Sequence, residues 1–203
     1  MSNFKKRFFI SLLAFPFIYI LLYQKTLFNI LIVIIFLFCF YEWIKIFKKK
    51  NNIFFFGLII LFIFLISLIR IYNFEDYNLI FLWLILITWL TDLGGYFFGK
   101  LFGGPKLTKI SPNKTWAGSI GSIILSQFAF LIFFLDVNYK FNFYIFFSQL
   151  FLSIIAQIGD ILMSYIKRIN NKKDTSNFIP GHGGFLDRVD GLIWIIIFGN
   201  IFI

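Results

Sequence analysis

The chain has 203 residues, of which 60% are hydrophobic and only 14% are charged, and its mean hydropathy is +0.89. Soluble domains average about 45–50% apolar and about 25% charged residues, so the composition excludes a water-soluble globular protein and predicts an integral membrane protein. The net charge of +10 would by itself also suit a nucleic-acid-binding protein. The one cysteine, Cys39, cannot form an intrachain disulfide and lies in an apolar segment, as expected of a small buried hydrophobe.

Seven apolar segments follow one another along the chain. A transmembrane helix needs about 20 residues, with a working range of about 17–25, and most of the segments reach that length once their flanks are included. The first follows Lys5, Lys6 and Arg7 without a small-x-small cleavage site, so we expect an uncleaved span rather than a signal peptide. The predicted fold is all-α and polytopic, with about seven spans at 8–23, 27–43, 53–69, 77–99, 116–135, 141–158 and 192–203.

The last apolar segment, 192–203, is too short to cross a bilayer by itself. It gives about 18 Å of helix, whereas the hydrocarbon core is about 30 Å thick. Either this helix spans incompletely or it begins earlier, near Arg188, with its first turn in a polar recess. We favour the earlier start, which would place Asp187 and Asp190 below the membrane surface.

The basic residues predict the orientation, because cytoplasmic loops carry an excess of Lys and Arg. With seven spans and a cytoplasmic N-terminus, every lysine and arginine falls on the inside except Lys25, Arg70 and Lys140. Topology and a site for anions therefore explain the basic excess, and nucleic-acid binding is not expected.

Two polar regions, 92–116 and 159–190, are too long to be simple connections, and both fall on the predicted cytoplasmic side. Charged groups beside hydrocarbon are costly and are functional candidates by default. We expect the two regions to face each other across a polar active-site cavity. The chain would then divide into a group of three N-terminal spans, 1–76, and a catalytic membrane domain, 77–203.

The second polar region begins as a continuation of the sixth span. If 160–171 is helical, Asp160, Ser164 and Lys167 lie on one face at i, i+4 and i+7. A carboxylate, a hydroxyl and an ammonium in that arrangement suit a metal ion and the phosphates that it neutralises. The alternative is a solvated helix end whose basic residues attract anionic lipid heads. Those residues are Lys167, Arg168, Lys172 and Lys173.

A glycine-rich loop, 179–184, follows and contains the chain's one histidine, His182. Glycines such as Gly183 and Gly184 allow positive φ and close backbone approach, so that successive N–H groups can bind phosphate. A simple turn would explain the same residues. His182 is open to three roles: a proton shuttle, a metal ligand or an orienting hydrogen-bond donor.

Asp187 and Asp190 lie at i and i+3, on one helical face. Two carboxylates that face together repel unless a cation lies between them or a base pairs with them. Mg²⁺ takes oxygen ligands and keeps waters and substrate phosphates in its shell, so the pair indicates a magnesium site. The alternative makes Asp187 a helix N-cap and Asp190 the ion-pair partner of Arg188.

In the first polar region, Lys114 and Thr115 precede the fifth span. They would offer an ammonium, a hydroxyl and free N–H groups to a phosphate, although a capped helix start with a topological lysine explains them equally well. Asp92, followed by Gly94 and Gly95, marks where the fourth span becomes polar. Capping or hydration explains Asp92 as well as binding does.

Together these segments resemble the signature of the phosphatidate cytidylyltransferases (CDP-diacylglycerol synthases). The resemblance covers roughly residues 90–190 and departs from the family at Ala117, where an acidic residue is frequent, and at 93–96; the chain is also shorter than typical members. It rests on Ser111-Pro112-Asn113-Lys114-Thr115-Trp116, Ser164-x-Ile166-Lys167-Arg168, Lys173-Asp174-x-Ser176 and Ile179-Pro180-x-His182-Gly183-Gly184-Phe185-x-Asp187-Arg188-Val189-Asp190.

The resemblance implies that CTP and phosphatidate give CDP-diacylglycerol and pyrophosphate with Mg²⁺, to which a second, monovalent or divalent, cation is an optional addition. From the patterns and the resemblance together we predict catalytic roles for Lys167, His182, Asp187 and Asp190, and metal binding by Asp160 and Asp187. The predicted substrate-binding residues are Asp92, Ser111, Lys114, Thr115, Ser164, Arg168, Lys173, Gly183, Gly184 and Arg188.

The expected partners are CTP, phosphatidate and the lipid bilayer, with a homodimer as a further option. The expected location is the inner (plasma) membrane, with the active site facing the cytoplasm. One alternative is CTP-dependent chemistry on another lipid, such as a polyprenol or phytol kinase or an archaeal-lipid cytidylyltransferase. A transporter that uses Asp92, Asp160 and Asp187 as a pathway is an alternative of a different class. A CDP-alcohol phosphotransferase would show an Asp-Gly-x-x-Ala-Arg motif, which the sequence lacks.

Overall fold

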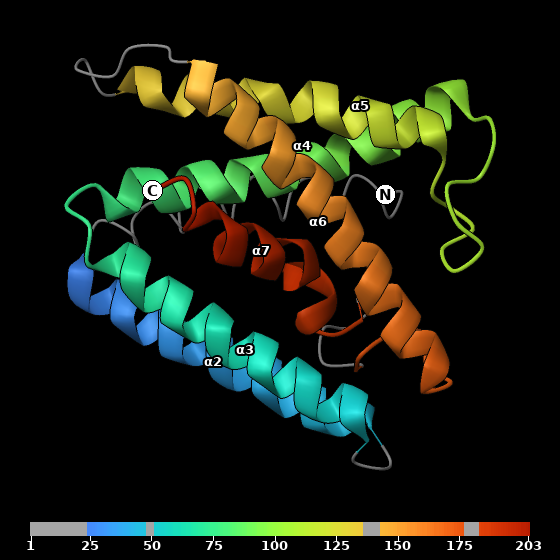
Figure 1. The fold of residues 1–203 in the computed structure, drawn as a ribbon, viewed down its shortest axis with the longest axis horizontal. Helices are drawn as coiled ribbons and strands as arrows, with labels where there is room; N and C mark the ends of the chain where they lie inside the picture. The colour runs from blue at the N-terminus through green and yellow to red at the C-terminus, as the bar shows by residue number, and fades with distance from the viewer. Residues whose placement is uncertain (1–23, 48–50, 136–142, 177–182) are drawn as a thin grey trace, which may run out of the picture.

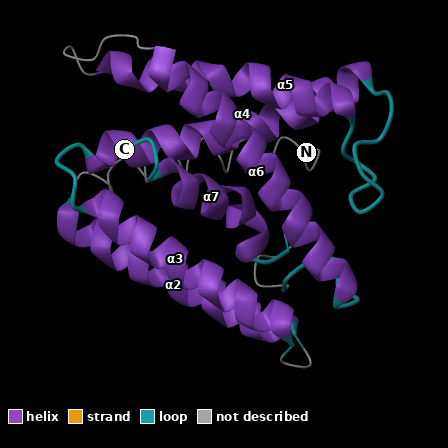
Figure 2. Ribbon diagram, in the orientation of Figure 1, coloured by secondary structure: helices purple, strands orange, loops and turns teal. Residues whose placement is uncertain are grey.

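A computed structural model describes residues 24–47, 51–135, 143–176 and 183–203 (Figure 1). In these residues the regular secondary structure is helical (Figure 2), and the predicted all-α class is confirmed for them. The elements are α2 (Lys25–Ile46), α3 (Asn52–Tyr72), α4 (Tyr77–Phe102), α5 (Trp116–Ser126), the 3-10 helix η1 (Gln127–Leu135), α6 (Phe143–Ile169) and α7 (Leu186–Gly199).

Four of the described helices, α2, α3, α4 and α6, are long and apolar enough to cross a membrane. The chain is therefore a polytopic helical membrane protein, as its composition predicts. These helices coincide with the second, third, fourth and sixth predicted spans. The first predicted span, 8–23, lies outside the described residues, so the count of seven spans stays a prediction.

The fifth predicted span is not one continuous α-helix, because α5 ends at Ser126 and the chain continues as η1. Two side chains compete for main-chain groups at this boundary. The hydroxyl of Ser126 and the amide of Gln127 both donate to the carbonyl of Ile123, at 2.8 and 3.2 Å. Such local side-chain bonds offer the backbone an alternative to the regular α-helical ladder.

The last helix, α7, begins at Leu186, two residues before the start predicted near Arg188, and has 14 residues. Its first turn contains Asp187, and its second contains Asp190. The predicted early start is therefore confirmed, and both carboxylates belong to the helix rather than to the loop before it.

Figure 1 shows α2 alongside α3, α4 alongside α5, α6 crossing the second pair, and α7 between the two pairs. The contact between α4 and α5 is the most extensive of any pair of described helices, and α7 packs mainly on α6, α3 and α4. Glycine permits the close approach of α4 and α5. A methyl group added at Gly94 would lie 2.5 Å from the carbonyl oxygen of Gly121 and 2.7 Å from Cα of Ser122.

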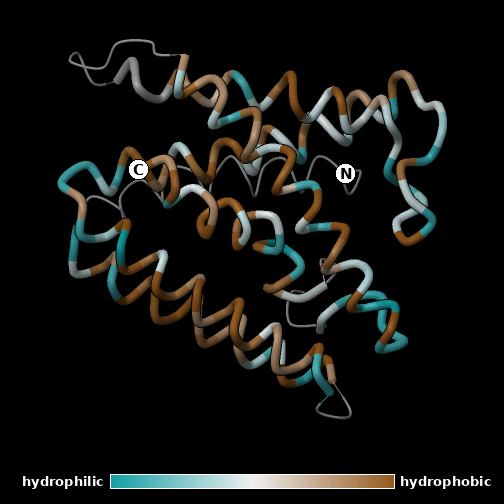
Figure 3. Tube along the Cα trace, in the orientation of Figure 1, coloured by the Kyte–Doolittle hydropathy of each residue, from teal (hydrophilic) through white to brown (hydrophobic). Residues whose placement is uncertain are grey.

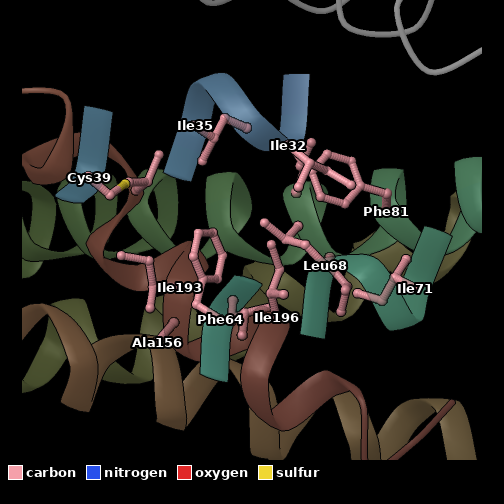
Figure 4. Packing of buried hydrophobic residues seen from close by; sticks show 14 of the residues in the cluster. Ile32, Ile35, Cys39, Phe64, Leu68, Ile71, Phe81, Ala156, Ile193 and Ile196 are labelled. Atoms are coloured by element: carbon pink, nitrogen blue, oxygen red, sulfur yellow. The ribbon is translucent and has the colours of Figure 1, made fainter. Parts of the chain in front are cut away.

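The buried core joins α2, α3, α4 and α7, as Figure 4 shows for Ile32, Phe64, Phe81 and Ile196, all at most 3% exposed. Large apolar side chains also cover the outer faces of α2 and α3. Leu37, Phe56 and Ile66 are exposed by 56%, 60% and 65%, as expected where a helix faces lipid chains instead of water.

In Figure 3 hydrophilic stretches occupy the ends of the helices and the connections between them, among them the loop between α4 and α5 and the C-terminal end of α6. These last two correspond to the two polar regions of the sequence. The structure connects them through α6, whose residues contact both, and the candidate site is built at this connection.

Candidate active site

A cavity of about 200 Å³ lies between α4, α5 and α6. Asp92 of α4, Asp160 of α6 and Lys114 in the loop before α5 contribute its charged groups. Pockets that hold a complete small-molecule ligand measure about 300–1,000 Å³, so this cavity has the size for part of a large ligand. The remaining lining residues are Thr91, Gly95, Tyr96, Leu107, Asn113, Thr115, Gly118, Ser119, Ser122, Ala156 and Gln157.

The loop from α4 to α5 holds Lys114 at the cavity. It leaves α4 through Gly103 and Gly104, whose φ values of 59° and 93° lie in the left-handed region that favours glycine. The N–H of Leu107 then donates to the carbonyl of Lys114 at 2.8 Å. Thr115 caps α5 by accepting the N–H of Gly118 at 3.1 Å, so its hydroxyl has the capping role that the sequence left as the alternative.

Lys114 forms an ion pair with Asp160, and the two side chains are 25% and 33% exposed. This contact joins the first polar region to the second. We expected these regions to face each other, and the structure places one residue of each in direct contact. The Lys114 ammonium is a group that can also form a charge-assisted hydrogen bond to a phosphate oxygen.

The polar wall of the cavity extends along α5 and α6 beyond the charged pair. The Ser119 hydroxyl donates to Oε1 of Gln157 at 2.5 Å, and the Ser122 hydroxyl donates to the Thr91 carbonyl at 2.6 Å. Neither Ser119 nor Gln157 was predicted as a site residue. Their signal in the sequence was weak, since single polar residues in an apolar helix also serve helix packing.

A second cluster, the α6–α7 junction, contains Lys167, Thr175, Gly184 and Asp187. The ammonium of Lys167 lies 2.6 Å from Oδ1 of Asp187, and the two side chains are 11% and 9% exposed. Oδ2 of Asp187 accepts the N–H of Thr175 at 2.8 Å, the N–H of Gly184 at 3.0 Å and the Thr175 hydroxyl at 3.0 Å. Asp187 thus ties the chain before α7 to the first turn of that helix and also holds a buried cation, but its described bonds do not make it the N-cap that the sequence left as the alternative.

The hydrogen bonds set the ionisation of Asp187. Burial would raise the pKa of its carboxyl, but the bonds from Lys167, Thr175 and Gly184 outweigh that effect, so the pKa lies below its ordinary value. The carboxylate is therefore ionised at neutral pH.

Glu42 of α2 lies against the same junction, and the sequence did not identify it. Its side chain is 1% exposed and accepts bonds from the N–H groups of Phe185 and Leu186 at 2.9 and 2.7 Å. The Ser176 hydroxyl donates to it at 2.6 Å, and the Thr175 hydroxyl, 2.9 Å away, shares its single proton between Glu42 and Asp187. The available signal was an isolated acidic residue at the end of an apolar segment.

Three further carboxylates interact where the cavity meets α7. Asp190 is close enough to Asp160 and Asp92 for electrostatic repulsion among the three carboxylates. Asp92 is in turn attracted electrostatically by Lys114 and Arg188. Within the described part of the chain, no group of three or more His, Cys, Asp or Glu residues forms a metal-binding arrangement. Asp92, Asp160 and Asp190 carry oxygen donors of the kind that Mg²⁺ takes, one on each of three helices, but they do not gather into such a group.

The two residues predicted to bind metal have different ionic partners, since Asp160 pairs with Lys114 and Asp187 with Lys167. Asp160 and Lys167 share α6 as predicted, but each belongs to a different cluster. The predicted pairing of Asp187 with Asp190 around one cation has no support in their contacts, because Asp190 accepts its closest bond from the N–H of Gly191, at 2.8 Å.

The other predicted site residues lie around these clusters. Ser164 is half-buried on α6, Lys173 is exposed, and exposed Arg168 donates to the carbonyl of Lys172 at 3.2 Å. Ser111 forms a turn, accepting the N–H of Lys114 at 3.1 Å. Gly183 has a φ of 79°, which confirms the positive φ expected in the glycine-rich loop. His182 lies outside the described residues.

Comparison with known proteins adds independent information. The sequence model of the cytidylyltransferase family matches residues 51–203. A phosphatidate cytidylyltransferase of Rickettsia typhi is 37% identical over 185 residues, which cover 87% of this chain and 81% of that protein. The enzyme of the same name from Brucella suis biovar 1 is 42% identical over 121 residues, covering 57% of this chain and 45% of that protein.

A phosphatidate cytidylyltransferase of Bacillus subtilis is 39% identical over 133 residues, or 64% of this chain and 49% of that protein. The chain thus spans less than half of the Brucella and Bacillus proteins and most of the Rickettsia protein. The family match contains the cavity and the α6–α7 junction but begins after Glu42.

Proposed function

The chain belongs to the cytidylyltransferase family, and we propose that it transfers a cytidylyl group from CTP to phosphatidate, giving CDP-diacylglycerol and pyrophosphate. One observation carries the proposal: two lysine–aspartate pairs, Lys114–Asp160 and Lys167–Asp187, lie along α6 within the region shared with relatives named for this reaction. Membrane helices suit the acceptor, because its diacyl chains stay in the bilayer while its phosphate meets CTP at the surface.

The proposed step needs no activated side-chain nucleophile. A phosphatidate oxygen, ionised at neutral pH, attacks the α-phosphorus of CTP; a new P–O bond forms, and the bond to the β-phosphate breaks and releases pyrophosphate. The obstacle is repulsion between the anions, about 4 kcal/mol for unit charges at 4 Å and an effective dielectric near 20. Positioning and charge neutralisation therefore carry the catalysis, as in phosphoryl transfer generally.

The chain's own residues would supply these two effects. Lys114 and Lys167 are held by carboxylates, and each ammonium has three donors, so each could donate to a phosphate oxygen while it keeps its carboxylate partner. The described contacts of Asp187 fix Lys167 where α6 meets α7. Arg188, exposed at the start of α7, would add a further cation toward the departing pyrophosphate.

Mg²⁺ is the proposed cofactor, with a second cation as an option. Asp92 and Asp160, which line the cavity, would contribute carboxylate oxygens to it, while Asp187 keeps its ion pair with Lys167. When bound, the ion would supply charge neutralisation at the phosphate oxygens. The described carboxylates do not by themselves form a group that could hold a metal, so the proposed ion would depend on waters and substrate phosphates, which Mg²⁺ usually keeps in its shell.

We place the site on the cytoplasmic side of the inner (plasma) membrane, in a protein of seven spans. The basic ends of the helices support this orientation. The Lys172 ammonium donates to the carbonyl of Lys45 at 2.5 Å, so the lysine-rich ends of α2 and α6 lie together. CTP would enter from this side.

The test is product formation by the purified full-length chain in detergent with Mg²⁺, CTP labelled at the α-phosphate, and phosphatidate. We expect labelled CDP-diacylglycerol and equimolar pyrophosphate. Asp187→Asn should reduce turnover at least 100-fold, and Lys109→Ala, at an exposed loop residue, should not change it. Parallel reactions contain a polyprenol or phytol instead of phosphatidate and CTP labelled at the γ-phosphate, because a kinase would transfer that phosphate to the lipid. Product from these lipids alone, or undiminished turnover by folded Asp187→Asn, would overturn the proposal.

A further inference from the structure

Glu42 is a buried carboxylate held by neutral donors. It lies on α2 and is 1% exposed, and the bonds described for it come from two main-chain N–H groups and two hydroxyls. A buried charge is costly unless hydrogen bonds compensate it. The four donors provide that compensation. All of them belong to residues 175–186, which are 133–144 residues away from Glu42 in the sequence.

The bonds to Phe185 and Leu186 complete the N-terminus of α7. The first N–H groups of a helix have no partner within the helix, and Phe185, the N-cap residue of α7, makes no side-chain capping bond. Glu42 supplies the missing acceptor from another helix, at 2.9 Å from Phe185 N and 2.7 Å from Leu186 N. Its negative charge also complements the positive end of the helix dipole.

The same carboxylate is linked to Asp187 through Thr175. The Thr175 hydroxyl lies 2.9 Å from Oε2 of Glu42 and 3.0 Å from Oδ2 of Asp187. Gly184 packs against this link: a methyl group added there would lie 2.5 Å from Oε2 of Glu42. Gly184 therefore packs directly against Thr175 and Glu42.

We propose that Glu42 is a positioning residue for the candidate active site. By holding residues 175–176 and the first turn of α7, it fixes Asp187, and through Asp187 the ammonium of Lys167, where the phosphates react. This role rests on the proposed function. Helix α2 contributes no residue to the cavity lining, but through Glu42 it would affect catalysis directly. Glu42 also precedes the family match, which begins at residue 51.

The decisive variant is Glu42→Gln. The amide keeps the size of the side chain, but in either orientation its NH₂ group faces one of the two main-chain N–H donors, so at least one of them loses its acceptor. A 1 Å misplacement of reacting groups can cost about 100-fold in rate. We expect kcat to fall 10- to 100-fold while the KM for CTP changes less than threefold, because the loss is in alignment and not in ground-state binding.

Cys39→Ala is the matched control, because Cys39 is fully buried on α2 one turn before Glu42. It should lower the melting temperature without changing kcat per folded molecule. Gly184→Ala, whose methyl group would overlap both the Thr175 hydroxyl and Oε2 of Glu42, should lower kcat like Glu42→Gln, and the double variant should lose much less than the product of the two single effects. A Glu42→Gln kcat within threefold of the parent, or multiplicative effects in the double variant, would refute the positioning role.

Hydrogen–deuterium exchange separates this inference from the proposed reaction. Glu42→Gln should accelerate exchange at residues 183–188 and leave α3 unchanged, and Cys39→Ala should not show this pattern. If the parent makes no product from CTP while this local exchange effect is present, the proposed function fails and the anchoring by Glu42 stands. Unchanged exchange at 183–188 would overturn the anchoring whatever the activity.

Discussion

Lys167 and Asp187, the last cation buried on α6 and the first carboxylate of α7, lie 2.6 Å apart with only 11% and 9% of their side chains exposed. Removing one member of a buried ion pair leaves the other charge uncompensated, at a cost of about 3–5 kcal/mol. The pair therefore links two helices, and it holds a buried ammonium group at their junction.

The first prediction concerns the stability of this link. Asp187→Asn should lower the free energy of unfolding by about 3 kcal/mol, because it strands the Lys167 ammonium in a buried position. Thermal unfolding in detergent measures the loss. Asp174→Asn, a change at a neighbouring exposed carboxylate, should be nearly neutral, and equal melting temperatures for the two variants would contradict the prediction.

The second prediction follows from the lowered pKa of Asp187. A carboxyl whose pKa is depressed by folding contributes stability above its unfolded pKa of about 3.9, and loses it as the pH falls through the folded value. The parent should therefore lose stability below about pH 4 more steeply than Asp187→Asn. Melting curves from neutral pH into this range measure the difference, and parallel profiles for parent and variant would exclude the contribution.

The third prediction tests whether Lys114 and Asp160 act as one unit. A double-mutant cycle with Lys114→Met and Asp160→Asn should give a coupling of about 1 kcal/mol in stability, since contacting residues are non-additive by about 0.5–3 kcal/mol. The control cycle combines Lys109→Met, at an exposed lysine, with Asp160→Asn. The stability losses of these two substitutions should be additive. Additive losses in the first cycle would mean that the pair contributes nothing beyond its members.

The fourth prediction concerns the contact of α4 with α5. Gly94→Ala should destabilise the protein by about 1–3 kcal/mol, as overpacking generally does, because the new methyl group meets main-chain atoms at 2.5–2.8 Å. Gly191→Ala is the control, since its nearest atoms would lie at 3.7 Å. The measurement is again thermal unfolding, and a Gly94→Ala variant as stable as the control would show that the two helices can separate freely.

The fifth prediction concerns Gln149, which is fully buried on α6. With its amide oriented to satisfy its neighbours, its oxygen accepts from the Trp83 indole and from the N–H of Phe130 in η1, both at 2.7 Å. Gln149→Leu should destabilise by about 1–3 kcal/mol, because it removes the buried oxygen to which these two groups donate. Ser148→Ala removes only a bond to the carbonyl of Ile145 and should cost less; the reverse order would argue against the assigned orientation.

The long helices could be predicted from the sequence because each depends on a local property, an uninterrupted apolar stretch. The same holds for the helical extension of α6 past Asp160 and for the early start of α7. The meeting of the two polar regions was predictable as well, since the positive-inside rule places both on one side. Lys114 and Asp160 confirm that these regions touch.

Contacts between distant residues could not be predicted in this way. Glu42 bonds to Leu186, 144 residues away, and nothing in its local sequence distinguishes it from a residue that ends a span. Carboxylate chemistry paired Asp187 with Asp190 around one cation, and the resemblance implied Asp160 and Asp187 as metal ligands. Which carboxylate faces which lysine depends on how α6 and α7 cross, and that geometry is set by packing among helices whose apolar faces look alike in the sequence.

The change from α5 to η1 has a consequence for the thickness of bilayer that this segment can match. A 3-10 helix rises about 2.0 Å per residue against about 1.5 Å in an α-helix, so the nine residues of η1 add about 4 Å of length without any added residue. The segment from Trp116 to Leu135 therefore reaches about 34 Å and exceeds a hydrocarbon core of about 30 Å. A continuous α-helix of the same residues would only just equal it and would have no allowance for tilt.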